Sequence, residues 1–431
     1  DPAKQQQEKS GGITVDNSAA EMHTTIYSIS ASPQDGNVIW VGTDDGNVQV
    51  TRDGGKTWTN TVRNIRGLPK ASWVSWVEAS RFDAATAYAA FDRHTFGDMD
   101  PHVYVTRDFG RSWTRIADRS QGVRGYAHVI KEDIVDRDLL FLGTEFGLWI
   151  SIDGGAHWAA FKGGKFPAVA VRDLAIQPRD HDLVIATHGR GLWIIDDITP
   201  LRHLDDRVID AELSLLPNRP QQQRIQGYGG WSRGDASFVG ANAPGGVVIT
   251  YHQKTRHLFG KLKLEIVDAN GKVVDTLPAS KRRGINRVEW AMTMKPPRTP
   301  QGAVLSGAAT YGPRLLPGRY TVRLTKNGKV HEAPLEVAMD PRASYSLAER
   351  ELQFAESMRL HGLFERMADL SDRLVGLREQ AGTRAATATG RNAKALRAFA
   401  DAVESLRKQI VATKEGGAIT GEERLREHLD F

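Results

Sequence analysis

The sequence predicts a mainly β protein that ends in an α-helical hairpin, and three observations support this fold class. A segment of roughly 45–50 residues is repeated along residues 24–200. Short strand-like alternations with Asn-Gly turns follow in residues 241–341. Ala, Leu, Glu and Arg dominate residues 342–431, as they do in helices. We therefore divide the chain into an N-terminal arm (1–23), a repeat region (24–200), a connector (201–240), a small β-sandwich (241–341), and a helical hairpin with the start of a third helix (342–431).

Each repeat carries a short apolar strand, a two-stranded hairpin and then the octet Ser/Thr-x-Asp-x-Gly-x-Thr/Ser-Trp. The octet occurs at Thr51–Trp58 and Thr106–Trp113, and at Ser151–Trp158 with His157 in the place of the second hydroxyl. A fourth repeat begins near Leu183 and stops before its last strand. Repeats of this length are typical of four-stranded propeller blades, so the sequence predicts a partial β-propeller of about four blades.

We expect the octets to hold hairpins closed and to take no part in catalysis. The Asp carboxylate can accept hydrogen bonds from backbone N–H groups of a tight turn, the Gly can adopt a conformation that other residues avoid, and the Trp can pack between blades. A carboxylate occupied in this way is a poor base. The residues assigned to this structural role are Asp53, Gly55, Trp58, Asp108, Gly110, Trp113, Asp153, Gly155 and Trp158.

Four repeats do not close a ring, because an open propeller leaves blade faces and strand edges in water. We therefore expect another chain, or the N-terminal portion of the same precursor, to complete the ring. The chain begins at Asp1 without a Met, and we interpret it as a C-terminal fragment of a longer protein.

The last region has the signals of a helical hairpin. Ser346 and Glu349 have the spacing of a capping box. Two apolar stripes with helical spacing follow, and we expect a small, polar loop at residues 381–392 to join them into an antiparallel hairpin. Thr420 with Glu423 predicts the start of a third helix.

The three octets, together with hairpins such as Val41–Gly46, resemble the Asp-box (BNR-repeat) β-propellers. The similarity is greatest to the sortilin/Vps10-like group of bacterial exported proteins, which are often labelled putative glycosyl hydrolases, and it covers residues 1–200. The later β segment is similar to the immunoglobulin-like modules of such proteins. The resemblance implies a bacterial protein with an extracytoplasmic location, periplasmic or secreted.

Composition narrows the classes of function. The chain has 57 Lys and Arg against 52 Asp and Glu, and this net charge of +5 is too small to indicate a nucleic-acid partner. Cysteine is absent, which excludes disulfides, thiolate metal sites and a cysteine nucleophile. No apolar run approaches the ~18 residues of a membrane-spanning helix. No phosphate loop, nucleophile elbow or zinc-protease helix occurs, so we expect no cofactor.

Charged residues gather at the turns between the second and third strands, which open on the face opposite the octets. Two carboxylates there could serve as the acid and the base or nucleophile of a glycosidase, which must lie about 5–10 Å apart. The candidate catalytic residues are Asp44, Asp92 and Glu145, and the candidate ligand-binding residues are Asp45, Arg93, His94, His188 and Arg190. The alternative interpretation of these turns is structural, because Asp and Gly favour hairpins and a His-Arg pair can be hydrogen-bonded for stability alone.

Three further groups complete the candidates. A metal site with oxygen and nitrogen ligands is conceivable in the long loop of the second blade, an ion pair is expected near the channel, and aromatic rings can serve as sugar platforms or as core. These groups are His94, Asp98, Asp100 and His102 for the metal, Arg172 and Asp173 for the ion pair, and Trp73, Trp76, Tyr228 and Trp231 for the rings.

The leading functional hypothesis is an exported propeller that binds a carbohydrate or peptide at its central mouth, with the sandwich and the hairpin as docking modules. A glycoside hydrolase that uses the propeller-face carboxylates is the first alternative. A structural subunit of a cell-surface complex, which makes contact through the helical hairpin, is the second.

Overall fold

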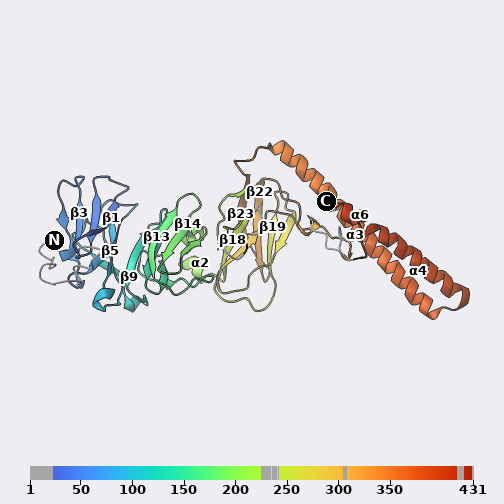
Figure 1. Cartoon of the computed structure of the whole chain (residues 1–431), viewed down its shortest axis with the longest axis horizontal. Helices are drawn as coiled ribbons and strands as arrows, with labels where there is room; N and C mark the ends of the chain where they lie inside the picture. The colour runs from blue at the N-terminus through green and yellow to red at the C-terminus, as the bar shows by residue number, and fades with distance from the viewer. Residues whose placement is uncertain are drawn as a thin grey trace. The chain divides into compact units, whose positions relative to one another are not determined.

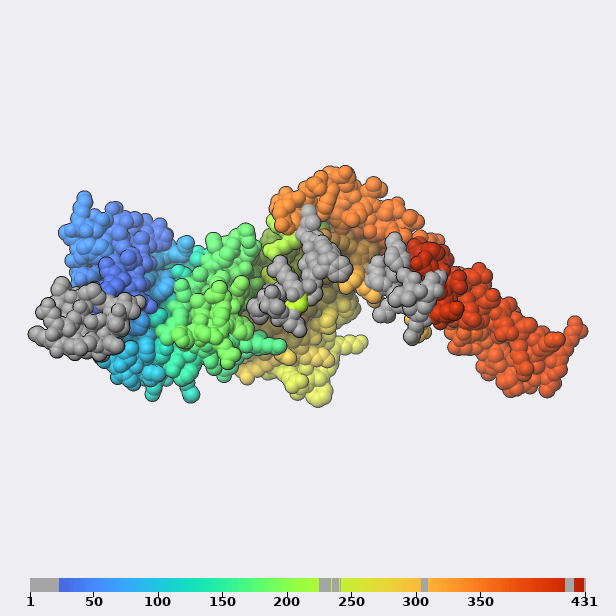
Figure 2. Space-filling view, viewed as in Figure 1, coloured from blue at the N-terminus to red at the C-terminus, as the bar shows by residue number. Residues whose placement is uncertain are grey.

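The structure is a computed structural model that describes residues 23–224, 234, 240, 242–303, 308–414 and 422–429. The chain forms two compact units, which divide between Arg207 and Val208. The first unit is coloured blue to green in the ribbon and space-filling views, and the second runs to red at the C-terminus (Figures 1 and 2). The N-terminal arm other than His23, and the candidate rings of Tyr228 and Trp231, lie outside the described residues.

The first unit consists of successive antiparallel sheets, each formed by strands in chain order. Three of these sheets have four strands and the last has three, as the early end of the fourth repeat predicts. This series of sheets is consistent with a partial propeller. The strands are β1 (Ile26–Ala31), β2 (Ile39–Thr43), β3 (Val48–Thr51), β4 (Thr59–Asn60), β5 (Trp73–Ala79), β6 (Ala87–Asp92), β7 (His102–Thr106), β8 (Thr114–Ala117), β9 (Ala127–Glu132), β10 (Leu140–Thr144), β11 (Gly147–Ser151), β12 (Ala159–Ala160), β13 (Val171–Gln177), β14 (Asp182–Thr187) and β15 (Leu192–Ile195).

Neighbouring sheets pack face to face through small residues and apolar cores. A Cβ atom added at Gly42 would clash with Val74 of the next sheet, and one added at Gly143 would clash with Val171. The hydroxyl of Ser28 on β1 accepts a 2.9 Å hydrogen bond from the backbone N–H of Val77 on β5. Each pair of adjacent sheets shares one buried cluster of aliphatic and aromatic side chains. The first strands of the successive sheets, β1, β5, β9 and β13, therefore lie next to one another. Their corresponding ends lie at the same edge of the first unit.

The first octet closes its hairpin as predicted. Asp53 accepts hydrogen bonds from the Thr51 hydroxyl at 2.8 Å and from the backbone N–H of Thr57 at 2.9 Å. The Thr57 hydroxyl donates a further bond at 2.6 Å. These bonds, with the Thr57 hydroxyl first, lower the pKa of Asp53 to about 2. Gly55 has a φ of 94°, a conformation that disfavours side chains.

The second and third octets repeat these contacts around Asp108 and Asp153. Ser112 donates to Asp108 through its N–H and its hydroxyl, at 2.9 and 2.6 Å. In the third octet, Nδ1 of His157 lies 2.7 Å from Asp153 and takes the place of the hydroxyl. Burial raises the pKa of both carboxyls, but the hydrogen bonds outweigh it and the net shift is downward. Gly110 and the glycine of the third octet again have positive φ.

The three octet tryptophans differ in exposure. Trp113 and Trp158 are each 8% exposed, whereas Trp58 is 43% exposed. Trp113 packs edge to face on Trp40 of the preceding sheet, with ring centroids 5.8 Å apart. The Trp158 ring donates to the carbonyl of Ile116 in the preceding sheet at 2.6 Å. Trp58 belongs to the first described sheet, which has no preceding sheet among the described residues to pack against.

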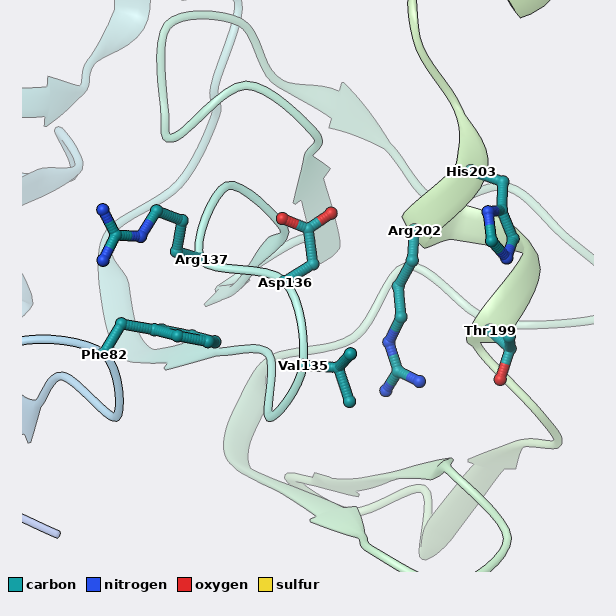
Figure 3. Close-up of a pocket in the computed structure, with 7 residues that line it drawn as sticks. All are labelled: Phe82, Val135, Asp136, Arg137, Thr199, Arg202 and His203. Atoms are coloured by element: carbon teal, nitrogen blue, oxygen red, sulfur yellow. The ribbon is translucent and has the colours of Figure 1, made fainter.

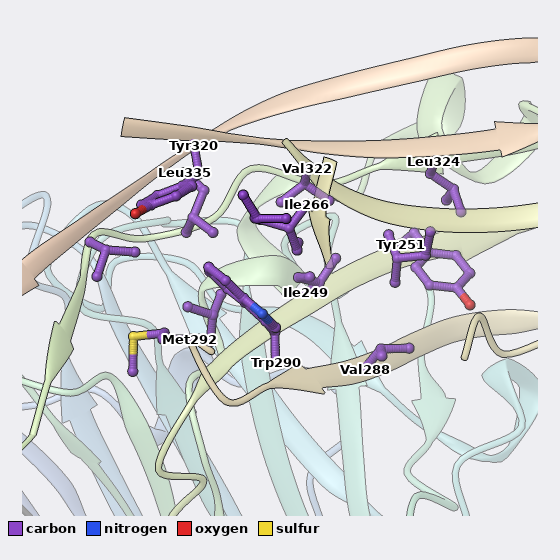
Figure 4. Close-up of a cluster of buried hydrophobic side chains, with 14 of the residues drawn as sticks. Ile249, Tyr251, Ile266, Val288, Trp290, Met292, Tyr320, Val322, Leu324 and Leu335 are labelled. Carbon is purple, nitrogen blue, oxygen red and sulfur yellow. The ribbon is translucent and has the colours of Figure 1, made fainter. Parts of the chain in front are cut away.

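The second unit contains two sheets that share one core (Figure 4). Trp290 and Tyr251 from one sheet and Val322 and Leu324 from the other are almost fully buried there. The three-stranded sheet has the order β16-β18-β21, and the five-stranded sheet has the order β17-β23-β22-β19-β20. Their strands are β16 (Leu213–Leu215), β17 (Gln221–Gln223), β18 (Val247–Gln253), β19 (Leu262–Val267), β20 (Val273–Leu277), β21 (Gly284–Trp290), β22 (Gly318–Lys326) and β23 (Lys329–Met339).

The range expected to be a connector, 201–240, contributes to this second unit. Strand β16 pairs with β18, and β17 runs parallel to β23 at the edge of the larger sheet. Polar sequence such as that of β17 lacks apolar alternation, so only the pairing with β23 identifies it as a strand. The short helical elements are η2 (Val62–Asn64), η3 (His94–Phe96), η4 (Arg119–Gln121), η5 (Thr199–His203), α2 (Asp206–Asp210) and η6 (Ala308–Thr310).

The helical hairpin is formed by α3 (Leu347–Thr387) and α4 (Gly390–Ile410), and the predicted capping box at Ser346 is confirmed. The predicted loop at 381–392 is wrong, because helix occupies all but two of its residues. Ala381 and Ala385 are buried in the helix, where their small side chains permit close packing. A short helix, α6 (Leu425–Leu429), follows, whereas Thr420 lies outside the described residues. Within the described ranges, no helix has the length and apolar character needed to span a bilayer.

Candidate functional site

A buried carboxylate lies at the edge where β6 ends and the first strands of the next two sheets begin. Asp92 is the last residue of β6 and its side chain is fully buried. One of its oxygens lies 2.5 Å from Nδ1 of His94, and the other lies 3.0 Å from Nδ1 of His128 on β9. Arg172 on β13 reaches the same place, with Nη1 at 3.7 Å from Asp92 and 3.1 Å from His128. We call Asp92, His94, Tyr126, His128 and Arg172 the mouth cluster.

The electrostatics of the cluster keep Asp92 ionised. Burial raises the pKa of Asp92, but hydrogen bonds from His128 and His94 lower it by more, so the net shift is downward. A carboxyl with a lowered pKa is a poor proton donor, and one with no exposed surface does not reach a substrate. Asp92 therefore serves to orient the two imidazoles and the guanidinium around it.

Aromatic rings form a wall beside these polar groups. Tyr126 stacks on His94 with ring centroids 4.7 Å apart, and its hydroxyl accepts a 3.0 Å hydrogen bond from Arg172. Trp73, the first residue of β5, packs edge to face on His128 at 5.6 Å. Tyr27 of β1 packs in the same way on Trp73 at 4.7 Å. Because Tyr27 is 46% exposed, the wall extends from the buried cluster to the surface.

Glu145 lies next to the mouth cluster and has one carboxylate oxygen without a hydrogen-bond donor among the described residues. It lies in the turn between β10 and β11, and its backbone N–H donates to the carbonyl of Tyr126 at 3.1 Å. Its Oε2 atom is buried and has no hydrogen-bond partner among the described residues. Burial raises the pKa of Tyr126, to which the charges of Asp92 and Glu145 add, while Arg172 opposes them. A buried acceptor without a donor is costly, and it is a feature that a bound ligand would satisfy.

The remaining acidic candidates, Asp44 and Asp45, lie in the β2–β3 turn of the first sheet and make local structural contacts there. Asp44 accepts hydrogen bonds from the backbone N–H groups of Thr24 and Thr25, at 2.8 and 2.7 Å. Asp45 is 1% exposed and accepts bonds from the Thr43 hydroxyl and the Asn47 side chain. These contacts are those of residues that stabilise a hairpin.

The basic candidates fall into two groups. Arg93 bonds to Asp98 at 3.1 Å and to the hydroxyl of Ser72 at 3.0 Å, so its guanidinium is occupied within its own blade. His188 and Arg190 lie on the exposed turn between β14 and β15, and the structure does not bring them to the mouth cluster through any hydrogen bond or ion pair of the described residues.

The ion pair expected near the channel and the four residues considered for a metal site have other contacts in the structure. The predicted ion pair of Arg172 with its neighbour Asp173 is replaced by the contacts of Arg172 with Asp92 and His128, because successive residues of a strand point to opposite faces. The four residues of the long loop that are candidate metal ligands have separate partners. Asp98 bonds to His102 and Arg93, Asp100 pairs with Arg119, and His94 bonds to Asp92. In the part of the chain that the structure describes, no group of three or more His, Asp or Glu side chains is arranged so that it could hold a metal ion.

Sequence reasoning missed Tyr126 and His128 and placed Arg172 in a different role. A usable signal was present, because Trp73, His128 and Arg172 each occupy the first or second position of the innermost strand of successive repeats. Polar or aromatic residues at the same position of neighbouring blades converge at one edge.

An open pocket of about 510 Å³ lies at the other end of the same strands (Figure 3). Phe82 and Val135 follow the last residues of β5 and β9, and Arg202 comes from η5. The Arg202 guanidinium bonds to the fully buried Asp133 at 2.8 and 2.9 Å, so it is occupied within the fold. Arg202 is therefore not a free cation for a ligand in this pocket, and we base the functional proposal on the mouth cluster.

Comparisons with known proteins identify no family model that matches the chain. Among curated proteins, the oligoxyloglucan-reducing end-specific xyloglucanase of Emericella nidulans is 29% identical over 92 residues, which cover 20% of this chain and 10% of that protein. The chain thus spans a tenth of the length of this curated relative.

Among solved structures, two that are similar to this chain are a YCF48 protein and a GH74 enzyme. YCF48 from Cyanidioschyzon merolae is 18% identical, with a TM-score of 0.31 over 41% of this chain and 54% of that chain. The GH74 enzyme of Niastella koreensis is 9% identical, with a TM-score of 0.32 over 72% of this chain and 46% of that chain. Scores of this size assign no function, so a functional proposal depends on the mouth cluster.

Proposed function

We propose that this protein binds a carbohydrate at the mouth of a β-propeller, in a site bounded by the mouth cluster, Glu145 and the ring of Tyr27. The observation that carries the proposal is the buried, unpartnered Oε2 atom of Glu145 beside an aromatic wall that reaches the surface. Sugar hydroxyls donate to such an acceptor, and sugar rings pack against flat aromatic faces.

The charges at the site favour a neutral ligand. The carboxylate of Asp92 lies within 3.7 Å of the Arg172 guanidinium, so the one arginine of the cluster already has a counter-charge. A peptide is the second candidate, because Arg172 is partly exposed and a guanidinium can bind a terminal or side-chain carboxylate. A peptide carboxylate would have to compete with Asp92 for Arg172, whereas a sugar would not.

A binding assay tests the proposal directly. The chain is titrated with a panel of soluble oligosaccharides and with short peptides, and heat of binding is measured. We expect binding to an oligosaccharide that weakens at least about tenfold in Glu145→Gln and in Tyr27→Ala. Asp136→Asn is the matched control, since Asp136 lies at the other end of the strands. Binding that is unchanged in Glu145→Gln would contradict the assignment of the site.

Hydrolysis is the alternative activity, and Glu145 favours it as a single candidate acid or base. Glycosidases generally need a second carboxyl about 5–10 Å from the first. Asp92 is buried and ionised, and Asp44 is bonded to backbone N–H groups, so neither is well suited to that role. Release of reducing sugar from the oligosaccharide that binds, abolished in Glu145→Gln, would favour an enzyme over a binding protein.

We also propose that the propeller belongs to the Asp-box, sortilin/Vps10-like group and that a portion of the precursor before Asp1 completes its ring. Support comes from apolar side chains at both ends of the series of sheets. Ile29 of β1 is 65% exposed and Trp58 is 43% exposed, while Leu192 and Ile194 of the last strand are 73% and 58% exposed. Co-expression of the upstream portion tests this proposal, with Trp58→Ala and Ile194→Asp expected to weaken copurification.

The remaining assignments rest on the resemblance. We propose that the protein is bacterial and exported, and that the two-sheet domain is immunoglobulin-like and serves for docking with the helical hairpin. A structural role in a cell-surface complex is a further candidate, because Leu370 and Leu377 of α3 and Phe399 and Leu406 of α4 are each more than 40% exposed. Fractionation of the source cells tests the location, and recovery in the cytoplasm would refute export.

A further inference from the structure

Two loops at one end of the two-sheet domain present a pair of exposed apolar side chains. The loop 254–261 joins β18 to β19, and the loop 278–283 joins β20 to β21. Leu258 and Phe259, at the outermost part of the first loop, are 65% and 85% exposed. Phe259 is therefore almost as accessible as it would be in an unfolded chain. We call these two loops the basic tip, for the basic residues that they carry.

The basic tip is held by hydrogen bonds and is not a frayed segment. The backbone N–H of His257 donates to the carbonyl of Lys281 at 3.0 Å and so ties the two loops together. The buried side chain of Gln253 donates to the carbonyls of Ser280 and Arg282 at 3.0 and 3.2 Å. The fold thus uses buried polar groups to keep this conformation, in which Leu258 and Phe259 stay in water. An adjacent pair of exposed apolar side chains on a loop held by hydrogen bonds is a candidate interaction site.

The loop that carries the apolar pair and the loop that lies against it are rich in basic residues. Lys254 pairs with Asp210 at 3.1 Å, and Lys326 pairs with Glu212 at 2.9 Å, so the carboxylates of Asp210 and Glu212 near this end already have cationic partners. Five further cations of the two loops are exposed and form no ion pair with a described residue. They are Arg256, Lys261, Lys281, Arg282 and Arg283.

We propose that the basic tip docks onto the surface of an anionic lipid bilayer, with Leu258 and Phe259 inserted among the lipids. Five exposed cations on two adjacent loops, none of them ion-paired to a described residue, match a negatively charged headgroup layer. In a bilayer the exposed apolar pair on the same loops has an apolar medium to enter, whereas a polyanion such as a nucleic acid offers none. An acidic protein is the competing occupant, and the test below distinguishes it. This inference is independent of the proposed ligand site, which lies in the other unit.

Vesicle sedimentation tests the docking. We expect the chain to sediment with vesicles of phosphatidylcholine that contain phosphatidylglycerol, to stay in solution with pure phosphatidylcholine, and to be released as salt rises. Arg282→Glu with Arg283→Glu should weaken binding at least about tenfold, as should Leu258→Asp with Phe259→Asp. The charge-matched control is Arg366→Glu with Arg373→Glu on α3, which should leave binding unchanged. Equal loss in the control, or no sedimentation with the acidic vesicles, would overturn the proposal.

Insertion is measured separately with a single label, which the absence of cysteine in the chain allows. An environment-sensitive fluorophore is attached to Phe259→Cys, and in a second sample to Asn270→Cys, in the exposed turn at the opposite end of β19. We expect a blue shift with acidic vesicles for the label at 259 and none for the label at 270. A shift at neither position, or a shift at 259 with an acidic protein but not with vesicles, would refute insertion into lipid.

Discussion

The Nδ1 atom of His128 lies 3.0 Å from the carboxylate of Asp92, although the two residues are 36 positions apart and belong to different sheets. Arg172 joins them from a third sheet. The mouth cluster therefore exists only where three repeats are packed together, and its geometry depends on the packing of the sheets as much as on the residues themselves.

Asp92→Asn should destabilise the first unit at neutral pH by about 2–4 kcal/mol, because it removes a buried charge on which hydrogen bonds converge. The folded-state pKa of Asp92 lies below its ordinary value of 3.8, so the carboxylate contributes stability above that value and loses it as pH falls through the folded pKa. Denaturant unfolding of both chains between pH 7 and pH 2 measures this. The difference in the free energy of unfolding between wild type and Asp92→Asn should shrink below about pH 4. A difference that stays constant would contradict the assignment of the stabilising role to the ionised carboxylate of Asp92.

Glu145→Gln should leave the free energy of unfolding unchanged or raise it slightly, although the residue is partly buried. The reason is that Oε2 of Glu145 has no donor among the described residues, so the wild-type group carries an unrecovered desolvation cost. Thermal unfolding without ligand measures the effect. A loss above about 1 kcal/mol would mean that Glu145 has a structural partner and that its open oxygen is not reserved for a ligand.

Trp158→Ala and Trp58→Ala form a matched pair, because both tryptophans end an octet and differ in exposure, at 8% and 43%. Removal of Trp158 should cost about 3–5 kcal/mol, since a large buried side chain leaves a cavity between two sheets. Removal of Trp58 from this chain should cost about 1 kcal/mol. Equal losses in denaturant unfolding would show that the octet tryptophans act within their own hairpins and not between sheets.

The helical hairpin should have its own dependence on acid. Glu404 bonds to Arg407 and to Arg378 at 2.7 Å, and these bonds, with Arg407 first, lower the pKa of Glu404 from 4.5 to about 2. Glu404→Gln should therefore destabilise the hairpin by about 0.5–1 kcal/mol at neutral pH and low salt. The difference from wild type should disappear as pH falls from 4.5 towards 2, and helix content followed by circular dichroism measures it. Persistence of the difference at pH 2 would exclude the ion pairs as its cause.

The octets and the helix cap could be predicted because their contacts are local. Asp53 bonds to residues two and four positions away, and Ser346 bonds to Glu349, so a short sequence pattern contains all the participants. The loop at 381–392 was predicted wrongly because small residues suggest a loop in isolation. In the structure these residues continue the helix, and Ala381 and Ala385 are buried.

The sequence by itself determined the repeats, the hairpins that the octets close, the three-stranded last sheet and the two long helices, because patterns among near neighbours in the chain specify each of them. Only the tertiary structure decided which polar residues meet. Asp44 bonds to a backbone N–H group, and Asp92 contacts two imidazoles. Oε2 of Glu145 has no hydrogen-bond partner among the described residues, and Arg172 pairs with a carboxylate of another sheet. The physical reason is that the contacts of Asp92 with His128 and Arg172 join residues from separate sheets, and the distances between sheets are set by the packing of side chains such as Val74 and Val171 against glycine.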